Sequence, residues 1–225
     1  MGAETPKQFL ELDGVPVLIF TLRRLAACPA ITDFVVATRV DEVDSLAARV
    51  AKESLGRPVR VVRGGDTRQD SVANALAEVP ADADLILVHD AVRPLVTRDQ
   101  IERVIAEALS CDAAILGMPA MDTVKEVKRA APQSGAADVA LITATIPRER
   151  VVLAQTPQVF RASLLLEAFA KARQDGVSAS DEAGLVERMG RDVHVVAGSD
   201  RNLKITRPGD MQIAEFYLRE ERAAR

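Results

Sequence analysis

Apolar and polar positions alternate along most of the chain with two periods, one typical of helices and one typical of strands. In the segment 41–56, apolar side chains recur at helical spacing, which predicts a helix with one apolar stripe. The run LILVH (85–89) is apolar almost without interruption, as in a strand buried on both faces. Thr97 and Gln100 form a capping box ahead of another amphipathic stretch. The same pattern predicts helices at 15–27, 41–56, 71–79, 101–109, 161–176, 180–190 and 208–221, and strands at 32–39, 59–62, 85–89, 113–118 and 193–198.

This alternation predicts an α/β fold of the Rossmann-like, doubly wound type, with a mostly parallel sheet and helices on both faces. The segment 119–155 departs from it, because PQSG (132–135) separates two strand-like runs and is typical of a hairpin turn. An extra hairpin in an α/β domain usually lies outside the main sheet and serves as an arm or an oligomer contact. We therefore expect one domain over residues 1–225, with 119–155 as an inserted β-arm used in dimerisation.

Composition narrows the classes of function. The net charge of −4 argues against a general nucleic-acid binder. Cys28 and Cys111 form no C-x-x-C pair and the chain has two histidines, so neither a disulfide framework nor a zinc site is expected. We see no apolar run long enough for a membrane span and no signal peptide. A cytoplasmic protein without nucleic-acid or membrane partners is the expectation.

Ligands of doubly wound sheets bind at the carboxyl ends of the strands, so the chemistry is expected there. The strand at 59–62 ends in RGGDTRQDSV, where two glycines allow close approach of a ligand to the backbone. Asp66 and Ser71 could bond a base or a ribose. The alternative is a tight turn in which Asp66 or Thr67 caps the next helix.

The buried strand at 85–89 ends in DAVRP. A carboxylate such as Asp90 is costly there unless it binds a cation or caps a turn, and Mg²⁺ would suit one carboxylate plus phosphate oxygens. Arg93 could hold an anion, and a structural pair between Asp90 and Arg93 is the alternative. His89 is expected to be a packed histidine rather than a catalytic base.

Two lysines, Lys204 in the extended NLKIT stretch and Lys7 in PKQF, could be phosphate ligands or plain surface residues. No nucleophile–base pair and no Ser-His-Asp triad can be placed. Glycine turns, one isolated carboxylate and several cations suit phosphoryl or nucleotidyl transfer, where catalysis is positioning plus charge neutralisation.

Taken together, seven blocks of the chain resemble the 2-C-methyl-D-erythritol 4-phosphate cytidylyltransferases of isoprenoid biosynthesis. In order along the chain they are PKQFLEL, GGDTRQDSV, VHDAVRP, MDTVKEV, AQTPQVF, SDEAGLVE and NLKITRPGD. The resemblance implies that CTP and methylerythritol phosphate give cytidine diphosphate methylerythritol and pyrophosphate. It also implies Mg²⁺ on the triphosphate, no covalent enzyme intermediate, and a homodimer in which each arm reaches the partner's site.

On the nucleotide side, the resemblance assigns Lys7 and Lys204 to charge neutralisation around the triphosphate. It assigns Asp90 to the metal and the α-phosphate. The positions expected to bind cytidine are Gly65, Asp66 and Ser71.

On the acceptor side, the resemblance makes Arg93 a binding arginine and places Thr156 in the acceptor pocket. Thr123 and Arg148 match acceptor-binding positions on the arm. Ser180 stands where the family usually has threonine, and it keeps the hydroxyl.

In this family a strand and a Gly-rich loop, roughly A-A-G-x-G-x-R-M-G, precede the PKQF block. Here Met1 and Gly2 coincide with the last two letters of that loop. The first strand of a doubly wound sheet is normally central, and without it the neighbouring strands keep unpaired backbone groups. We therefore expect the native chain to extend upstream.

Two other functions stay open. One is a sister cytidylyltransferase that acts on ribitol 5-phosphate, which would share the CTP site and differ around Thr123, Arg148 and Ser180. The other is a catalytically dead CTP-binding protein, favoured by the missing loop and opposed by the retained Lys7, Asp90 and Lys204.

Overall fold

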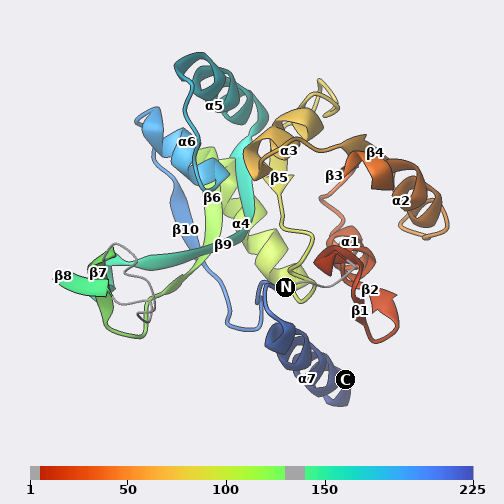
Figure 1. The fold of residues 1–225 in the computed structure, drawn as a ribbon. Coiled ribbons are helices and arrows are strands. Elements are labelled where there is room, and N and C mark those ends of the chain that lie inside the picture. Colours follow the sequence, from red (N-terminus) through yellow and green to blue (C-terminus); the bar gives the residue numbers. More distant parts are fainter. Residues whose placement is uncertain (1–5, 130–139, 225) are drawn as a thin grey trace, which may run out of the picture.

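The main sheet has four strands in the order β10-β6-β9-β5 (Figure 1). The computed structural model describes residues 6–129 and 140–224. β6 pairs in parallel with β10, and β9 pairs antiparallel with both β6 and β5, so β5, β6 and β10 share one direction. Their carboxyl ends therefore lie at one edge of the sheet. The bounds are β5 Leu85–Val88, β6 Ala113–Pro119, β9 Val152–Arg161 and β10 His194–Ala197.

The antiparallel strand β9 was not among the expected strands. It lies at the centre of the sheet, and its residues 155–160 are buried. Proline is rare inside a central strand because it cannot donate to the ladder, so Pro157 hides this strand from a prediction by pattern. The β6–β9 register shifts between Ile115 and Leu116, which face Gln158 and Gln155, so the irregularity falls beside the proline.

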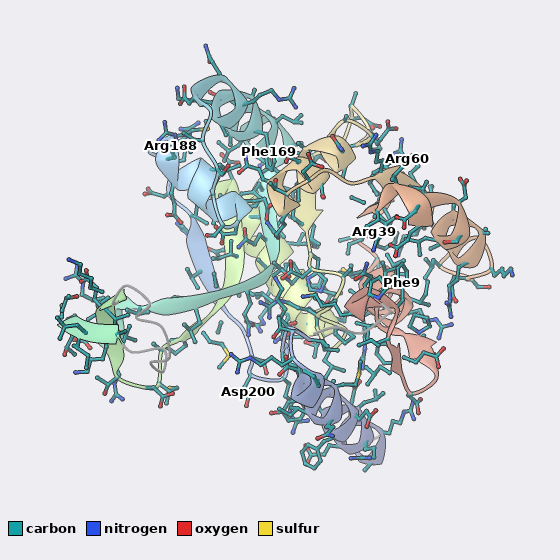
Figure 2. The ribbon with its side chains drawn as sticks, in the orientation of Figure 1. Phe9, Arg39, Arg60, Phe169, Arg188 and Asp200 are labelled. Atoms are coloured by element: carbon teal, nitrogen blue, oxygen red, sulfur yellow. The ribbon has the colours of Figure 1, made fainter. Side chains whose placement is uncertain are left out.

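Alternation along β6 builds a core on each face of the sheet. Ala114 and Leu116 join a cluster with α1, α2 and α4, whereas Ala113 and Ile115 join a cluster with α5 and α6. Phe169 of α5 lies in this second layer (Figure 2). The helices are α1 Val17–Ala26, α2 Val43–Val50, α3 Arg68–Leu76, α4 Arg98–Cys111, α5 Ala162–Asp175, α6 Glu182–Arg188 and α7 Pro208–Ala223, with 3-10 turns η1 Lys7–Phe9, η2 Val40–Glu42 and η3 Arg148–Arg150.

The strands β3 (Phe34–Thr38) and β4 (Val59–Arg63) pair in parallel but stand apart from the main sheet. Within the described residues, β3 pairs only with β4 and β5 pairs only with β9. A cavity of about 810 Å³ lies between them, lined by both strands and by residues of α1, α3 and α4. This cavity separates two strand edges that both have unpaired backbone groups in the described part of the chain.

A two-stranded arm projects from the body of the molecule (Figure 1). It consists of β7 (Val124–Arg129) paired antiparallel with β8 (Ala140–Ile146). The interval 119–155 also contains the ends of β6 and β9, which pair at the base of the arm. The expected turn at 132–135 lies outside the described residues.

A short hairpin precedes α1. β1 (Glu11–Leu12) pairs with β2 (Val15–Pro16), and the turn residues Asp13 and Gly14 both have positive φ, as a tight Asp-Gly hairpin turn requires. Leu12 packs with α7 and the segment after β5 in a third apolar cluster. Among the described residues, no helix is long and apolar enough to cross a membrane.

Candidate active site

Asp90 is the centre of a cluster of charges at the carboxyl end of β5. Lys204 Nζ lies 2.9 Å from Asp90 Oδ2, and Arg93 Nε lies 3.3 Å from the same oxygen. Arg68 Nε lies 3.4 Å from Asp90 Oδ1. The structure thus brings together three predicted residues, Asp90, Arg93 and Lys204. Arg93 belongs to the same loop as Asp90, whereas Lys204 comes from a distant part of the sequence. Arg68 was not predicted and joins them.

The cations hold Asp90 in its ionised form. Burial alone would raise the pKa of Asp90, but the hydrogen bond and charge of Lys204, with the charges of Arg68 and Arg93, lower it below its usual value. Burial lowers the pKa of Arg93, and the charge of Asp90 opposes that shift. The alternative interpretation of Asp90, a structural pair with Arg93, therefore describes only part of its surroundings.

Thr156 and His89 form a polar network behind Asp90. The backbone N–H of Asp90 donates to Thr156 Oγ1 at 3.0 Å, and Thr156 Oγ1 lies 3.0 Å from His89 Nδ1. His89 Nε2 lies 3.1 Å from the Arg93 carbonyl oxygen, which can only accept. Burial lowers the pKa of His89 to about 4. The ring is therefore neutral with its proton on Nε2, and hydrogen bonds hold it on both sides although it also lines the cavity between β3 and β5.

Lys204 is positioned by the segment after β10. Arg93 Nη1 donates to the Asn202 carbonyl oxygen at 2.7 Å, and the Ile205 N–H donates to the Val92 carbonyl at 2.9 Å. Asn202 is fully buried, and its Nδ2 donates to the Thr156 carbonyl at 2.9 Å. These bonds fix the backbone on both sides of Lys204 against the loop that contains Asp90.

Arg68 and Glu182 belong to the site although no pattern in the sequence pointed to them. Arg68 forms a fork with Glu182, at 2.7 Å and 2.9 Å, and also contacts Asp90. Glu182 is buried, with 1% of its surface exposed, so this ion pair is screened little by solvent. Although both residues stand in recognised blocks, 114 positions separate them, and only the fold brings them together.

The loop after β4 is so compact that only glycine fits at positions 64 and 65. A Cβ on Gly65 would lie 2.2 Å from Asp70 Cβ, and one on Gly64 would lie 2.9 Å from Ser71 Oγ. Thr67, not Asp66, caps α3, in a capping box with Asp70. The hydroxyl of Ser71 accepts from the Gly65 N–H at 3.0 Å, so Ser71 holds the loop.

The remaining predicted residues lie apart from the Asp90 cluster. In the described part of the chain, no hydrogen bond or ion pair joins Lys7, Asp66 or Ser180 to it, and all three are exposed. Thr123 and Arg148 are exposed at the base of the arm. Arg148 Nη1 donates to the Met121 carbonyl at 2.7 Å.

Residues 1–220 match the family model described as IspD: 2-C-methyl-D-erythritol 4-phosphate cytidylyltransferase. The chain belongs to this family. A protein of that name from Acidobacterium capsulatum is 55% identical over 216 residues, which are 96% of this chain and 88% of the relative. Its namesake from Solibacter usitatus is 49% identical over 217 residues, 96% of this chain and 86% of the relative.

Solved structures agree with this family and with its α/β fold. The fold is similar to the crystal structure of 2-C-methyl-D-erythritol 4-phosphate cytidylyltransferase from Thermus thermophilus, with a TM-score of 0.75, 36% identity, and 95% and 94% of the two chains covered. The crystal structure of 4-diphosphocytidyl-2C-methyl-D-erythritol synthase from Anaerococcus prevotii gives a TM-score of 0.83 at 28% identity, with 94% of this chain and 93% of the other covered. The chain is thus a cytidylyltransferase of this family, and the expected fold class is confirmed.

Proposed function

We propose that this protein transfers the cytidylyl group of CTP to 2-C-methyl-D-erythritol 4-phosphate, giving 4-diphosphocytidyl-2-C-methyl-D-erythritol and pyrophosphate in the cytoplasmic non-mevalonate pathway to isoprenoids. The observation that carries the proposal is the convergence of Lys204, Arg93 and Arg68 on Asp90 beside a glycine loop. These three cations outnumber the two carboxylates of the cluster, Asp90 and Glu182, so the site favours a polyanion such as a triphosphate. Membership of the family supports the choice of nucleotide and acceptor.

The chemistry asks the protein for positioning and charge neutralisation. A phosphate oxygen of the acceptor attacks the α-phosphorus of CTP in line, the bond from the α-phosphorus to the bridging oxygen breaks, and pyrophosphate leaves. Lys204 lies within the cluster and would neutralise charge that develops on the α-phosphate. Lys7 is exposed at η1 and would do the same for the triphosphate. Gly65, Asp66 and Ser71 would surround the cytidine.

Mg²⁺ fits the donor chemistry at Asp90. Asp90 is an ionised carboxylate, the hard oxygen donor that Mg²⁺ prefers, and Mg²⁺ commonly binds through one carboxylate and substrate phosphates. Its cationic partners Lys204 and Arg68 have side chains long enough to turn to phosphate oxygens when the nucleotide enters. The ion would supply neutralisation of the triphosphate.

The acceptor pocket would combine residues from two chains. Arg93, Thr156 and Ser180 would come from the chain that binds CTP. Thr123 and Arg148 would come from the arm of a second copy. Apolar side chains of the arm and its base are exposed in the single chain, which supports contact with a partner: Met121, Val127, Leu141, Ile142, Val152 and Leu153.

The test is pyrophosphate release from CTP and Mg²⁺ with methylerythritol phosphate as acceptor. It is run on the 225-residue chain and on that chain extended upstream by a strand and Gly-rich loop of the family pattern. We expect the extended chain to release pyrophosphate. In that chain, Asp90→Ala should lower kcat by about 10²-fold or more, because the variant removes the charge around which the cations are arranged. Asp41→Ala is the control, since Asp41 forms an exposed ion pair with Arg39 on the surface.

Unchanged turnover in the Asp90 variant would remove Asp90 from the site. Release with ribitol 5-phosphate and not with methylerythritol phosphate would assign the protein to the sister activity. Binding of CTP without release by either folded chain would leave a nucleotide-binding protein and contradict the proposal.

A further inference from the structure

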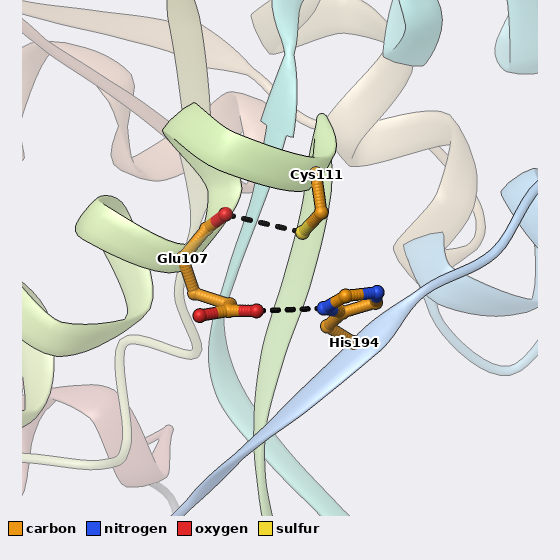
Figure 3. A group of neighbouring side chains, drawn as sticks. All are labelled: Glu107, Cys111 and His194. Carbon is orange, nitrogen blue, oxygen red and sulfur yellow. Dashed lines mark hydrogen bonds and ion pairs between the residues drawn. The ribbon is translucent and has the colours of Figure 1, made fainter.

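Three side chains with metal-binding atoms converge at the C-terminal end of α4. They are Glu107, Cys111 and His194 (Figure 3). One ligand atom from each lies within 4.8 Å of the ligand atoms of the other two. Glu107 Oε1 and His194 Nδ1 are 2.6 Å apart, so they share a proton in a hydrogen-bonded pair. None of the three takes part in the proposed transfer reaction.

Local structure brings these residues together. Glu107 and Cys111 are four positions apart on α4, so they stand on one face of the helix in successive turns. Asp112 ends α4 in a left-handed conformation and the chain turns directly into β6. β10 pairs in parallel with β6 from His194 opposite Ala114, which places His194 beside the end of α4.

We propose that Glu107, Cys111 and His194 bind a divalent transition-metal ion of the zinc class. A thiolate, an imidazole nitrogen and a carboxylate oxygen together suit Zn²⁺ and related borderline ions rather than Mg²⁺. Three protein ligands would leave one position of a tetrahedral site to water. Spacing within the chain does not indicate this site, because His194 comes from a separate strand and only the β6–β10 register places it.

Binding exchanges protons for the metal in a balanced way. The Cys111 thiol now donates to the carbonyl oxygens of Glu107 and Ala113, at 3.1 Å and 3.2 Å. On binding, the thiol proton leaves to solvent, and the proton between His194 Nδ1 and Glu107 moves to Nε2 of the imidazole, so that Nδ1 and the carboxylate oxygen are free for the ion. No oxidation or reduction is involved.

The ion has access to the ligands. The side chains of Glu107 and His194 are 39% and 51% exposed. Cys111 is half-buried and lines a hollow of about 260 Å³ together with polar residues that include Asp112 and Asp192. An ion can therefore enter from solvent without opening the core.

A metal ion bound by these residues would link α4 to β10. The structure already holds the other end of β10 to α4, where Arg103 Nη1 donates to the Ala197 carbonyl at 3.1 Å. A metal at His194 would fix the beginning of the same strand. Because β10 leads directly to the segment that positions Lys204, the ion would stabilise the element that delivers this lysine.

Co²⁺ titration of the chain, in saturating Mg²⁺ to occupy carboxylate sites, tests the proposal. We expect one equivalent to bind with a thiolate-to-cobalt charge-transfer band, which Asp90 cannot give, and Zn²⁺ to abolish the band by displacement. Cys111→Ser should remove the band, and His194→Gln and Glu107→Gln should weaken binding by about tenfold or more. Cys28→Ala and Glu102→Gln are matched controls, since Cys28 is buried elsewhere in the core and Glu102 stands earlier on α4.

A second readout does not depend on the thiolate band. Zn²⁺ should raise the Tm of the unmodified chain and of both controls, because it binds the folded state, and should raise the Tm of His194→Gln by less at the same concentration. The absence of a thiolate band, or a band that survives Cys111→Ser, would overturn the site. Equal Tm shifts in the unmodified chain and in His194→Gln would overturn it as well. None of these results depends on the transferase activity.

Discussion

His89 is a residue whose neutral state is built into the fold. Its pKa is lowered from 6.5 to about 4 by burial, and both ring nitrogens are engaged by Thr156 and Arg93. Below pH 6.5 the unfolded chain binds a proton at this position and the folded chain does not. The free energy of unfolding is therefore unaffected by His89 above pH 6.5. It decreases as the pH falls towards 4, by on the order of 3 kcal/mol at most.

We expect the Tm of the protein to fall over this interval, and His89→Asn to flatten the slope. Thermal unfolding at several pH values between 4 and 7 measures both. His194→Asn is the control because it removes the only other histidine of the sequence, and its slope between pH 4 and 6.5 should persist. A slope that is unchanged in His89→Asn would show that other groups cause the loss. Asp90 contributes in a different window, because its pKa is lowered from 3.8.

Among single residues, the sequence predicts a role for those whose residue type is unusual for their position in a helix or strand. Asp90 stands out because a carboxylate follows a buried strand, and the structure places it at the centre of the charge cluster. Arg68 and Glu182 do not stand out, because charged side chains are usually exposed and no local pattern links these two. Their pairing joins the first residues of α3 and α6, which only the fold brings together.

At the scale of elements, the main feature is the cavity between the strands β3 and β5. Both strands have one unpaired edge within the described chain, and the cavity between them is lined largely by apolar residues of the strands and of α1 and α4. A strand inserted there would pair with two edges and bury side chains on both faces. Each buried large apolar side chain contributes about 1.5–3 kcal/mol.

We therefore expect a chain extended upstream by an apolar strand and a Gly-rich loop to be the more stable form. Each kcal/mol gained raises the Tm by about 2–4 °C in a chain of this size. Thermal unfolding measures the gain, and hydrogen exchange should show new protection of the β3 and β5 amides. The matched control carries aspartate at the central position of the added strand and should lose most of the gain. Equal Tm values for the 225-residue and extended chains would contradict this use of the cavity.

Among the elements, periodicity predicts those with a single clear pattern. The helices and most strands lie where the apolar spacing places them, within a few residues at their ends, except that α2 ends at Val50 and not at Gly56. β9 was missed because Pro157 interrupts it, although ten residues make it the longest strand described. Its antiparallel pairing with β5 and β6 follows from tertiary packing and not from its own composition.

The whole molecule places its predicted acceptor residues in two separate regions. Arg148 stands at the base of the arm, where it contacts the Met121 carbonyl, and no described contact joins it to Lys204 or Asp90. The arm also exposes a row of apolar side chains, among them Leu141 at 69% exposed. In a single chain the proposed acceptor pocket would be incomplete and the apolar side chains of the arm are uncovered, and a two-fold dimer would resolve both.

Mixing two inactive variants distinguishes a shared site from one built within a single chain. If Arg148 acts on the partner's site, a mixed dimer of Arg148→Ala and Lys204→Ala contains one site with both residues intact. Random exchange makes about half of the dimers mixed, so about a quarter of the original activity should return. Pyrophosphate release from the mixture, with dimer exchange verified by mass, measures it.

The decisive control uses two residues that the structure already shows in contact. Asp90 and Lys204 lie 2.9 Å apart within one chain, so a mixture of Asp90→Ala and Lys204→Ala has no intact site in any dimer and should stay inactive. Recovery in the first mixture alone requires that the arm completes the partner's pocket. Failure of the first mixture, with mixed dimers present, would mean that Arg148 serves its own chain, and the arm would then have to fold back towards Asp90 rather than project away from it.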